Sequence, residues 1–192
     1  TFTPVLCSFA THIRKMMETL MSSKTRIKLL LKFFLNRQTT AYLRSLEGEF
    51  GESTNAIRLE LNKLESAGML SAAQEGNKKV FRANTQHPLF KEIHSIIRKH
   101  IGLDRIIETV VERLGEVDKV YLVGEFSRGL DSDIIDLIFV GNIDQAYLIK
   151  LIAKAEKLVK RKIRYLIYQT EELDRINWET FKPAPLLIWS ND

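Results

Sequence analysis

The feature that most constrains the fold lies in the first half of the chain, where a helix-like segment ends at a glycine and two strand-like segments follow. Ser53 or Thr54 is a suitable N-cap for an amphipathic helix that ends at Gly68. Residues 70–83 then contain two short strand-like runs separated by the turn Glu75-Gly76-Asn77-Lys78, which favours a β-hairpin. The sequence therefore predicts a helix followed directly by a hairpin.

Two further helices are predicted ahead of this segment. A pair of serines precedes the first, which we expect over residues 24–35. A shorter helix is predicted over 41–50, with Gly51 as its C-terminal cap. Three helices followed by a hairpin is the element order of a winged-helix domain, which we therefore expect over residues 22–87.

The remainder predicts a helical connection and a second, smaller domain. Pro88 opens a stretch of helical apolar stripes, so residues 88–115 are expected to be a helical linker. Residues 116–192 alternate between strand and helix patterns, which predicts a small α/β domain and an α+β fold class for the chain. The predicted strands cover 120–123, 134–140, 163–168 and about 186–189, the helix covers about 144–160, and a glycine-rich turn follows the first strand.

The N-terminal segment, residues 1–21, has apolar residues at helical spacing from about residue 4. A helix this apolar must bury its stripe, and we expect it to serve as a dimerisation arm. The segment lacks the pattern of a secretory signal, and no apolar run approaches the roughly 20 residues that span a bilayer. With Cys7 as the single cysteine, neither an internal disulfide nor a thiolate metal site is expected, and we expect a cytoplasmic protein.

Charge is distributed unevenly along the chain. The net charge is +5, and residues 22–87 also carry a net +5, whereas residues 116–192 carry a net −2. A basic module beside a weakly acidic one suggests a polyanion as partner of the basic part. We expect that partner to be double-stranded DNA.

The candidate DNA contacts follow from this placement. The helix that begins at Ser53 would enter the major groove, and Asn and Arg side chains on its outward face can make paired hydrogen bonds to adenine and guanine. The turn of the predicted hairpin places positive charge on a tip that can reach a phosphate or the minor groove. The candidate DNA-binding residues are Ser53, Thr54, Asn55, Arg58, Asn62, Lys63, Asn77, Lys78, Lys79 and Arg82.

Several stretches resemble a known family. Residues 24–30, 42–44, 56–70 and 76–84 are similar to the arsenical-repressor-type winged-helix domain, and more narrowly to members in which that domain precedes a nucleotidyltransferase-like domain. The resemblance implies DNA binding as a homodimer. Arsenical repressors sense metals through Cys and His pairs, but the spacing of His87, His94 and His100 does not fit one helical face. We therefore expect no metal and no cofactor.

The second domain resembles a nucleotidyltransferase in outline. Residues 124–129 and 132–141 are similar to the motif in which a Gly-Ser turn holds a triphosphate and the next strand carries Asp-x-Asp for Mg²⁺. Here Glu125 follows the first glycine, and Ile134 stands two residues before Asp136, where the first ligand would be. Arg164 stands where a third acid would be wanted. The alternative to a missing first ligand is a one-residue bulge, which could bring Asp133 beside Asp136.

These observations predict a sequence-specific DNA-binding transcription regulator whose second domain is catalytically inactive. That domain would serve dimerisation or the binding of a small ligand or nucleotide, through Gly124, Arg128, Asp133 and Asp136. No catalytic residue is assigned. A basic run over 154–164, with Lys154, Lys157 and Arg161 expected on one helix face, could assist. The alternative is an active, antitoxin-like nucleotidyltransferase that its winged helix directs to a target.

Overall fold

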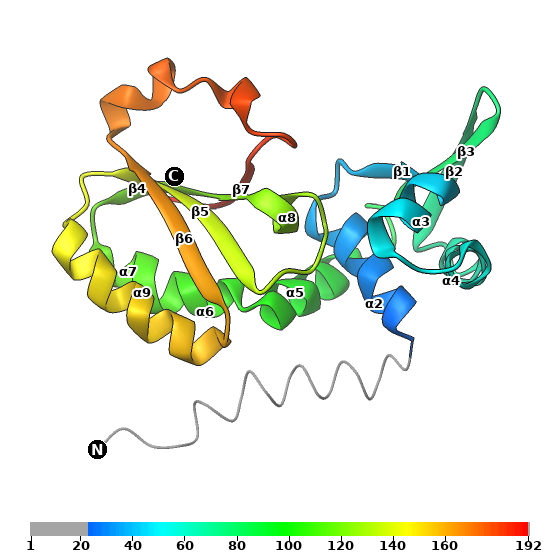
Figure 1. Cartoon of the computed structure of the whole chain (residues 1–192), viewed down its shortest axis with the longest axis horizontal. Coiled ribbons are helices and arrows are strands. Elements are labelled where there is room, and N and C mark those ends of the chain that lie inside the picture. Colours follow the sequence, from blue (N-terminus) through cyan, green and yellow to red (C-terminus); the bar gives the residue numbers. More distant parts are fainter. Residues whose placement is uncertain (1–22, 192) are drawn as a thin grey trace. The chain divides into compact units, whose positions relative to one another are not determined.

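The computed structural model describes residues 23–191, coloured along the chain in Figure 1. The helix expected within residues 1–21, and its predicted role in dimerisation, lie outside the described residues. The described chain divides into two compact units. The helix–hairpin unit comprises residues 23–97 and 128–131, and the sheet unit comprises residues 98–127 and 132–191.

The helix–hairpin unit begins with α2 (Lys24–Leu30), capped by Ser23, whose Oγ accepts a hydrogen bond from the Arg26 N–H at 3.2 Å. The helix continues as one π-helical turn, η1 (Leu31–Leu35). Together they match the helix predicted over 24–35. The side chains of η1 are all buried, so this turn lies at the centre of the unit's core.

The second helix begins two residues later than the sequence pattern indicated. A short strand, β1 (Thr40–Tyr42), takes the place of the expected helix start, and α3 (Leu43–Phe50) follows it. The reason is tertiary, because Ala41 pairs with Phe81 in an antiparallel ladder and is buried there. Sheet hydrogen bonds thus determine the local conformation, whereas the C-cap at Gly51 agrees with the prediction, with φ +62°.

The helix and hairpin predicted from the central segment are confirmed. Helix α4 (Thr54–Ser66) begins after Ser53, whose Oγ accepts from the Ala56 N–H at 3.2 Å. Strands β2 (Leu70–Glu75) and β3 (Lys78–Ala83) pair antiparallel around Gly76. With β1 they form a three-stranded sheet in the order β1-β3-β2.

The core of the helix–hairpin unit collects apolar residues from each of its helices and from the hairpin. Burying such side chains contributes about 1.5–3 kcal/mol each, and this packing fixes α4 against α2 and α3. The fully or nearly fully buried residues include Leu29, Leu30, Leu31, Phe33, Phe34, Leu35, Leu46, Ile57, Leu61, Leu64, Leu70, Phe81 and Ile97.

The predicted linker is a series of helices. These are α5 (Phe90–Ile101), α6 (Leu103–Ile106), the π-helical turn η2 (Ile107–Val111) and α7 (Glu112–Leu114). The break at Gly102 has φ +94°, and a Cβ there would come within 2.7 Å of the Val159 side chain. Glycine is therefore required at position 102 both by the backbone conformation and by the close approach of Val159.

The sheet unit contains the mixed α/β part that the sequence predicted. Strands β4 (Val117–Val123), β5 (Ile134–Gly141), β6 (Lys162–Tyr168) and β7 (Leu186–Ser190) form a sheet in the order β6-β5-β4-β7. Helix α9 (Gln145–Val159) connects β5 to the parallel strand β6, and the other pairs are antiparallel. The expected glycine-rich turn instead begins with a short helix, α8 (Gly124–Ser127), in which Ser127 Oγ donates to the Gly124 carbonyl oxygen at 2.8 Å.

The two faces of this sheet are covered differently. Helices α6 and α9 lie on one side of the sheet in Figure 1. Residues 169–185, here called the covering segment, lie on the other side. This segment includes the 3₁₀ turns η3 (Thr170–Arg175) and η4 (Trp178–Thr180). Val123, Ile138 and Val140 form a buried cluster on this face. Partly buried side chains of β4, β6 and the covering segment pack against the cluster; they are Tyr121, Tyr168, Leu173, Trp178 and Phe181.

Candidate functional site

A groove runs between α4 and the hairpin in the helix–hairpin unit. Its volume is about 540 Å³. Predicted DNA-contact residues of the hairpin and of α4 both line it. Six of its ten lining residues carry basic or amide side chains, and the other four are apolar or aromatic. The lining residues are Tyr42, Leu43, Arg44, Arg58, Leu61, Asn62, Asn77, Lys78, Lys79 and Phe81.

Helix α4 presents the predicted side chains on the face opposite its buried stripe. Asn55, Arg58, Asn62 and Lys63 are exposed, whereas Thr54 is half-buried. Ser53, also among the predicted contacts, is the N-cap of the helix, and its hydroxyl oxygen accepts from a helix N–H. The buried stripe of the same helix is Ile57, Leu61 and Leu64.

An ion pair between α2 and α4 helps to hold α4 in position. The buried carboxylate of Glu60 accepts from Arg26 Nε at 2.7 Å and from Lys63 Nζ at 3.1 Å. Burial alone would raise the pKa of Glu60, but the hydrogen bonds and charges of Arg26 and Lys63 outweigh it and lower the pKa below its ordinary value of 4.5. Lys63 is therefore paired with a carboxylate of its own helix although its side chain is exposed.

The basic side chains of the hairpin are oriented by neighbours. Lys78 Nζ lies 4.3 Å from the centre of the Tyr42 ring, a cation–π contact. Lys79 Nζ pairs with Glu65 at the end of α4 at 2.7 Å, and Arg82 Nε donates to Ser71 Oγ at 3.3 Å. Of these contacts, the Lys79–Glu65 ion pair joins the hairpin to α4.

Two arginines at the groove differ from Lys79 in one respect. Within residues 23–191, neither Arg44 nor Arg58 has an ion-pair partner. Both are exposed. Together with Lys78, which contacts the Tyr42 ring but no carboxylate of the described residues, they are available to an external anion or a base edge.

The groove brings together half of the predicted DNA contacts. Arg58, Asn62, Asn77, Lys78 and Lys79 line it. The other five lie on the same unit outside the groove; they are Ser53, Thr54, Asn55, Lys63 and Arg82.

Arg44, which its place on the second predicted helix makes a possible contact of the DNA backbone, also lines the groove. One feature of this surface was not predicted from the sequence. Leu59 exposes 53% of its surface on the outward side of α4. A helical wheel drawn from Ser53 could have placed Leu59 there, since it lies four residues from both Asn55 and Lys63.

The second predicted site centres on Gly124 and Asp136 in the sheet unit. Gly124 follows β4 with φ +68°, and a Cβ at this position would collide with the Asp136 carboxylate. The glycine thus lets the carboxylate lie against the backbone of the β4–α8 turn. The structure brings these two of the four predicted residues together.

Asp136 is occupied by an arginine of the neighbouring strand. Asp136 on β5 stands opposite Arg164 on β6 in the parallel ladder. Arg164 Nε lies 2.6 Å from Asp136 Oδ1 and Nη2 lies 3.0 Å from Oδ2, a two-point ion pair. The hydrogen bond from Arg164 to Asp136 and the charge of Asp136 raise the pKa of Arg164. Both carboxylate oxygens therefore already have a donor.

The other two predicted residues are not gathered at this carboxylate. Arg128 belongs to the helix–hairpin unit, where its carbonyl oxygen accepts from Lys32 Nζ at 2.9 Å. Asp133 is exposed and precedes β5, and its carbonyl oxygen accepts from the Lys162 N–H at 2.9 Å. The β5–β6 ladder is regular from Ile134 to Val140. The bulge that would have placed Asp133 beside Asp136 is therefore not formed along this ladder.

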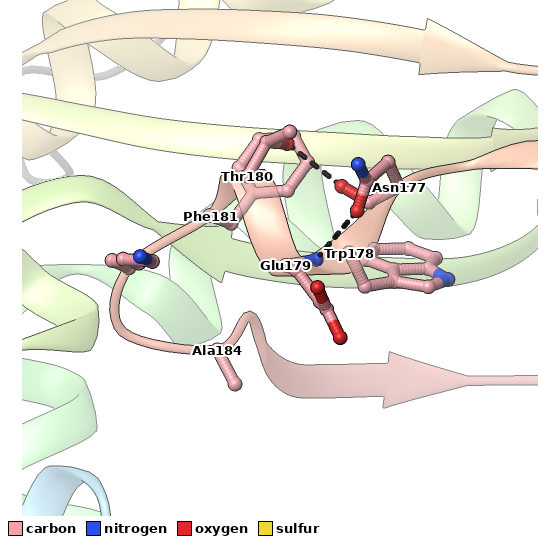
Figure 2. Close-up of a pocket in the computed structure, with 7 residues that line it drawn as sticks. Asn177, Trp178, Glu179, Thr180, Phe181 and Ala184 are labelled. Atoms are coloured by element: carbon pink, nitrogen blue, oxygen red, sulfur yellow. Dashed lines mark hydrogen bonds between the residues drawn. The ribbon is translucent and has the colours of Figure 1, made fainter.

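The space beside Asp136 is a pocket of about 500 Å³ between the sheet and the covering segment. Arg164 and Tyr165 line it from β6, and Phe181 and Lys182 line it from the covering segment. A neighbouring hollow of about 640 Å³ is formed by Asn177–Ala184 itself, as Figure 2 shows. Its curvature is fixed by Asn177, whose Oδ1 accepts from the Glu179 N–H at 3.2 Å and whose carbonyl oxygen accepts from Thr180 Oγ1 at 2.7 Å.

The expected basic helix face on α9 is not formed as predicted. The helix ends at Val159, and Arg161 lies beyond it, 7% exposed. Its guanidinium stacks 5.1 Å from the centre of the Phe126 ring and donates to the Ser132 carbonyl oxygen. Arg161 is therefore a core residue, and Lys160, with φ +55°, supplies the left-handed turn between helix and strand.

In the part of the chain that the structure describes, no group of three His, Cys, Asp or Glu side chains is placed to hold a metal ion. His94 Nδ1 lies 2.6 Å from the Phe34 carbonyl oxygen. No helix among the described residues has both the length and the apolar composition needed to cross a membrane.

Comparison with known proteins adds little. No protein-family description matches the chain, and no curated protein matches it. Among solved structures, the chain is similar to a "putative nucleotidyltransferase" from Sulfolobus solfataricus, with 22% sequence identity and a TM-score of 0.33. The match covers 47% of this chain and 78% of that chain. A likeness at this level assigns neither an activity nor a substrate.

Proposed function

We propose that the helix–hairpin unit is a winged-helix DNA-binding domain and that the chain is a sequence-specific transcription regulator. The observation that carries this proposal is the groove between α4 and the hairpin. Amides and cations from α3, α4 and the hairpin converge there, and three of these cations, Arg44, Arg58 and Lys78, lack an ion-pair partner among the described residues. In a regulator of this kind, α4 occupies the major groove and the hairpin reaches the adjacent backbone.

The chemistry of the groove fits a nucleic acid better than a small molecule. Arg58 and Asn62 are one helical turn apart on α4, so both can face base edges, with Arg hydrogen-bonded to guanine and Asn to adenine. Lys78, on the hairpin, supplies a charge suited to a phosphate. A net charge of +5 over residues 22–87 adds long-range attraction to the DNA backbone.

Selection from a library of random DNA duplexes tests the proposal. The full chain is expected to enrich a defined sequence, and homodimeric binding would make that sequence a near-palindrome. The matched control is the same selection with Arg44 and Arg58 both changed to Ala, which should enrich no sequence. Enrichment no better than that of the double variant would refute the assignment.

We further propose that the sheet unit transfers no nucleotide and serves dimerisation or the binding of a small ligand. Support comes from Asp136, the carboxylate that a nucleotidyltransferase motif would use, because Arg164 occupies both of its oxygens. Ile134, two residues earlier on the same face of β5, offers no ligand atom. Catalysis of phosphoryl transfer depends mainly on positioning the reactants and on neutralising charge with bound metal ions. The loss of a metal ligand is therefore not easily compensated.

Incubation with labelled nucleoside triphosphates, Mg²⁺ or Mn²⁺, and cell extract tests the second proposal. We expect no label on protein or nucleic acid above the level given by the Asp136→Asn variant. Label transfer that disappears in Asp136→Asn would instead support the active, antitoxin-like nucleotidyltransferase.

A further inference from the structure

An exposed leucine lies on α4, the helix that the proposed function directs to the major groove. Leu59 exposes 53% of its surface, although leucine is among the residues most often buried. The apolar contacts that fix α4 are made by Ile57, Leu61 and Leu64, which are 0–4% exposed. Leu59 is therefore not needed for the packing of the helix.

The neighbours of Leu59 on the helix surface are polar and exposed. Asn55 lies four residues before it, and Asn62 and Lys63 lie three and four residues after it. Residues three and four apart are adjacent on a helix surface. Leu59 thus stands in the middle of a polar stripe, with an asparagine on either side along the helix axis.

Such a stripe fits one kind of base pair. An asparagine amide can make paired hydrogen bonds to N6 and N7 of adenine in the major groove, and the thymine paired with adenine presents there a C5-methyl group. That methyl is the apolar group on the base edges of the major groove that an aliphatic side chain can cover. Covering it would remove water from both the methyl and the exposed leucine.

We propose that Leu59 contacts the C5-methyl of a thymine and that it is a specificity-determining residue for the DNA sequence bound. This inference rests on the proposed function, which it deepens by naming a base and an atom. Removing one buried methyl contact costs about 0.8 kcal/mol, or a factor of about four in affinity.

The test uses the duplex selected by the full chain and a second set of probes in which each thymine is replaced, one at a time, by deoxyuridine. Deoxyuridine lacks the methyl and keeps the hydrogen-bonding pattern. We expect one or more positions at which the replacement weakens binding about fourfold. At those positions the Leu59→Ala variant is expected to bind thymine and deoxyuridine probes equally.

Two control variants separate this contact from a general effect. Leu59→Met keeps an apolar side chain of similar size and should retain the preference for thymine. Ile149→Ala changes an equally exposed side chain, 59% exposed, on α9 of the sheet unit, and should also retain it. Because Leu59 is exposed, its replacement by Ala should leave the midpoint of thermal unfolding unchanged.

The outcomes distinguish the inference from the function beneath it. If the full chain prefers no duplex sequence, the proposed function fails and the inference fails with it. If it prefers a sequence but binds all deoxyuridine probes as tightly as the thymine probe, the inference alone is refuted. The inference is equally refuted if Leu59→Ala keeps the sensitivity to deoxyuridine, because another residue then contacts the methyl.

Discussion

Arg58 and Arg164 are both exposed arginines on regular elements, and their surroundings are opposite. Arg58 on α4 has no ion-pair partner within the described residues, and an open groove lies beside it. Arg164 on β6 is held by Asp136 through two hydrogen bonds, beside a pocket that the covering segment helps to form. The first surface leaves its charge available, whereas the second neutralises its own charge. Residue type alone does not distinguish Arg58 from Arg164, whereas the presence of an ion-pair partner does.

The largest expected effect concerns the closely packed site on the sheet. Gly124→Ala would force a side chain against Asp136 and a non-glycine residue to φ +68°. We expect a loss of about 3 kcal/mol in the free energy of unfolding, from overpacking and backbone strain together. Chemical denaturation monitored by circular dichroism measures it.

Gly48→Ala is the matched control, because a Cβ at Gly48 meets no atom within 4 Å. Gly48 lies in the interior of α3, so Ala should be neutral or stabilising by up to about 1 kcal/mol. Equal stability of the two variants would show that the carboxylate at Asp136 is not fixed against the turn, and the contrast between the two surfaces would fail.

The next effect compares the two arginines directly. Arg58→Ala is expected to weaken binding to the selected duplex by about 1–3 kcal/mol, with a smaller loss on random duplexes. Arg164→Ala should leave both affinities unchanged. Fluorescence anisotropy titrations measure all four values. Equal loss on selected and random duplexes for Arg58→Ala would remove Arg58 from base contact and leave it a phosphate contact.

A smaller effect is expected at the hairpin. Lys78→Ala should weaken binding to all duplexes alike and reduce the slope of log affinity against log salt by about 0.9, the value for one phosphate contact. Lys157→Ala, an exposed cation on α9, is the control and should leave the slope unchanged. An unaltered slope for Lys78→Ala would place its charge away from the DNA backbone.

The smallest effect is on acid stability. Because the pKa of Glu60 is lowered in the folded state, its ionised form stabilises the fold fully above its ordinary value of 4.5. That contribution is lost as the pH falls through the lowered pKa. Glu60→Gln should therefore flatten the loss of stability between about pH 5 and about pH 3, measured by urea midpoints. Glu47→Gln, an exposed carboxylate on α3, should keep the wild-type profile.

Local sequence signals predicted most of the elements and failed where tertiary contacts decide. Caps and glycines located α4, with Ser53 at its start and Gly68, φ +72°, just past its end. The strand at β1 was missed because it exists only through its pairing with β3. A three-residue segment carries no periodicity that could distinguish it from the first turn of a helix.

The sites show the same division. The outward side chains of α4 follow from helical spacing alone, and the hairpin turn follows from its glycine and asparagine. The pairing of Asp136 with Arg164 required the register of two parallel strands, which no local pattern encodes. The covering segment could not be predicted from local pattern either, because contacts between residues distant in the sequence hold its irregular backbone. One such contact joins Tyr121 and Trp178, whose ring centres are 4.9 Å apart.

The strand order β6-β5-β4-β7 has a consequence for synthesis on the ribosome. Every helix and strand of the three-stranded sheet and its groove precedes residue 98, so these elements can fold while the rest of the chain is still being made. Strand β4, by contrast, keeps one unpaired edge until β7 has emerged, about 60 residues after β4 ends. During that interval the nascent chain would expose an edge that invites pairing with other strands, while its groove is already complete.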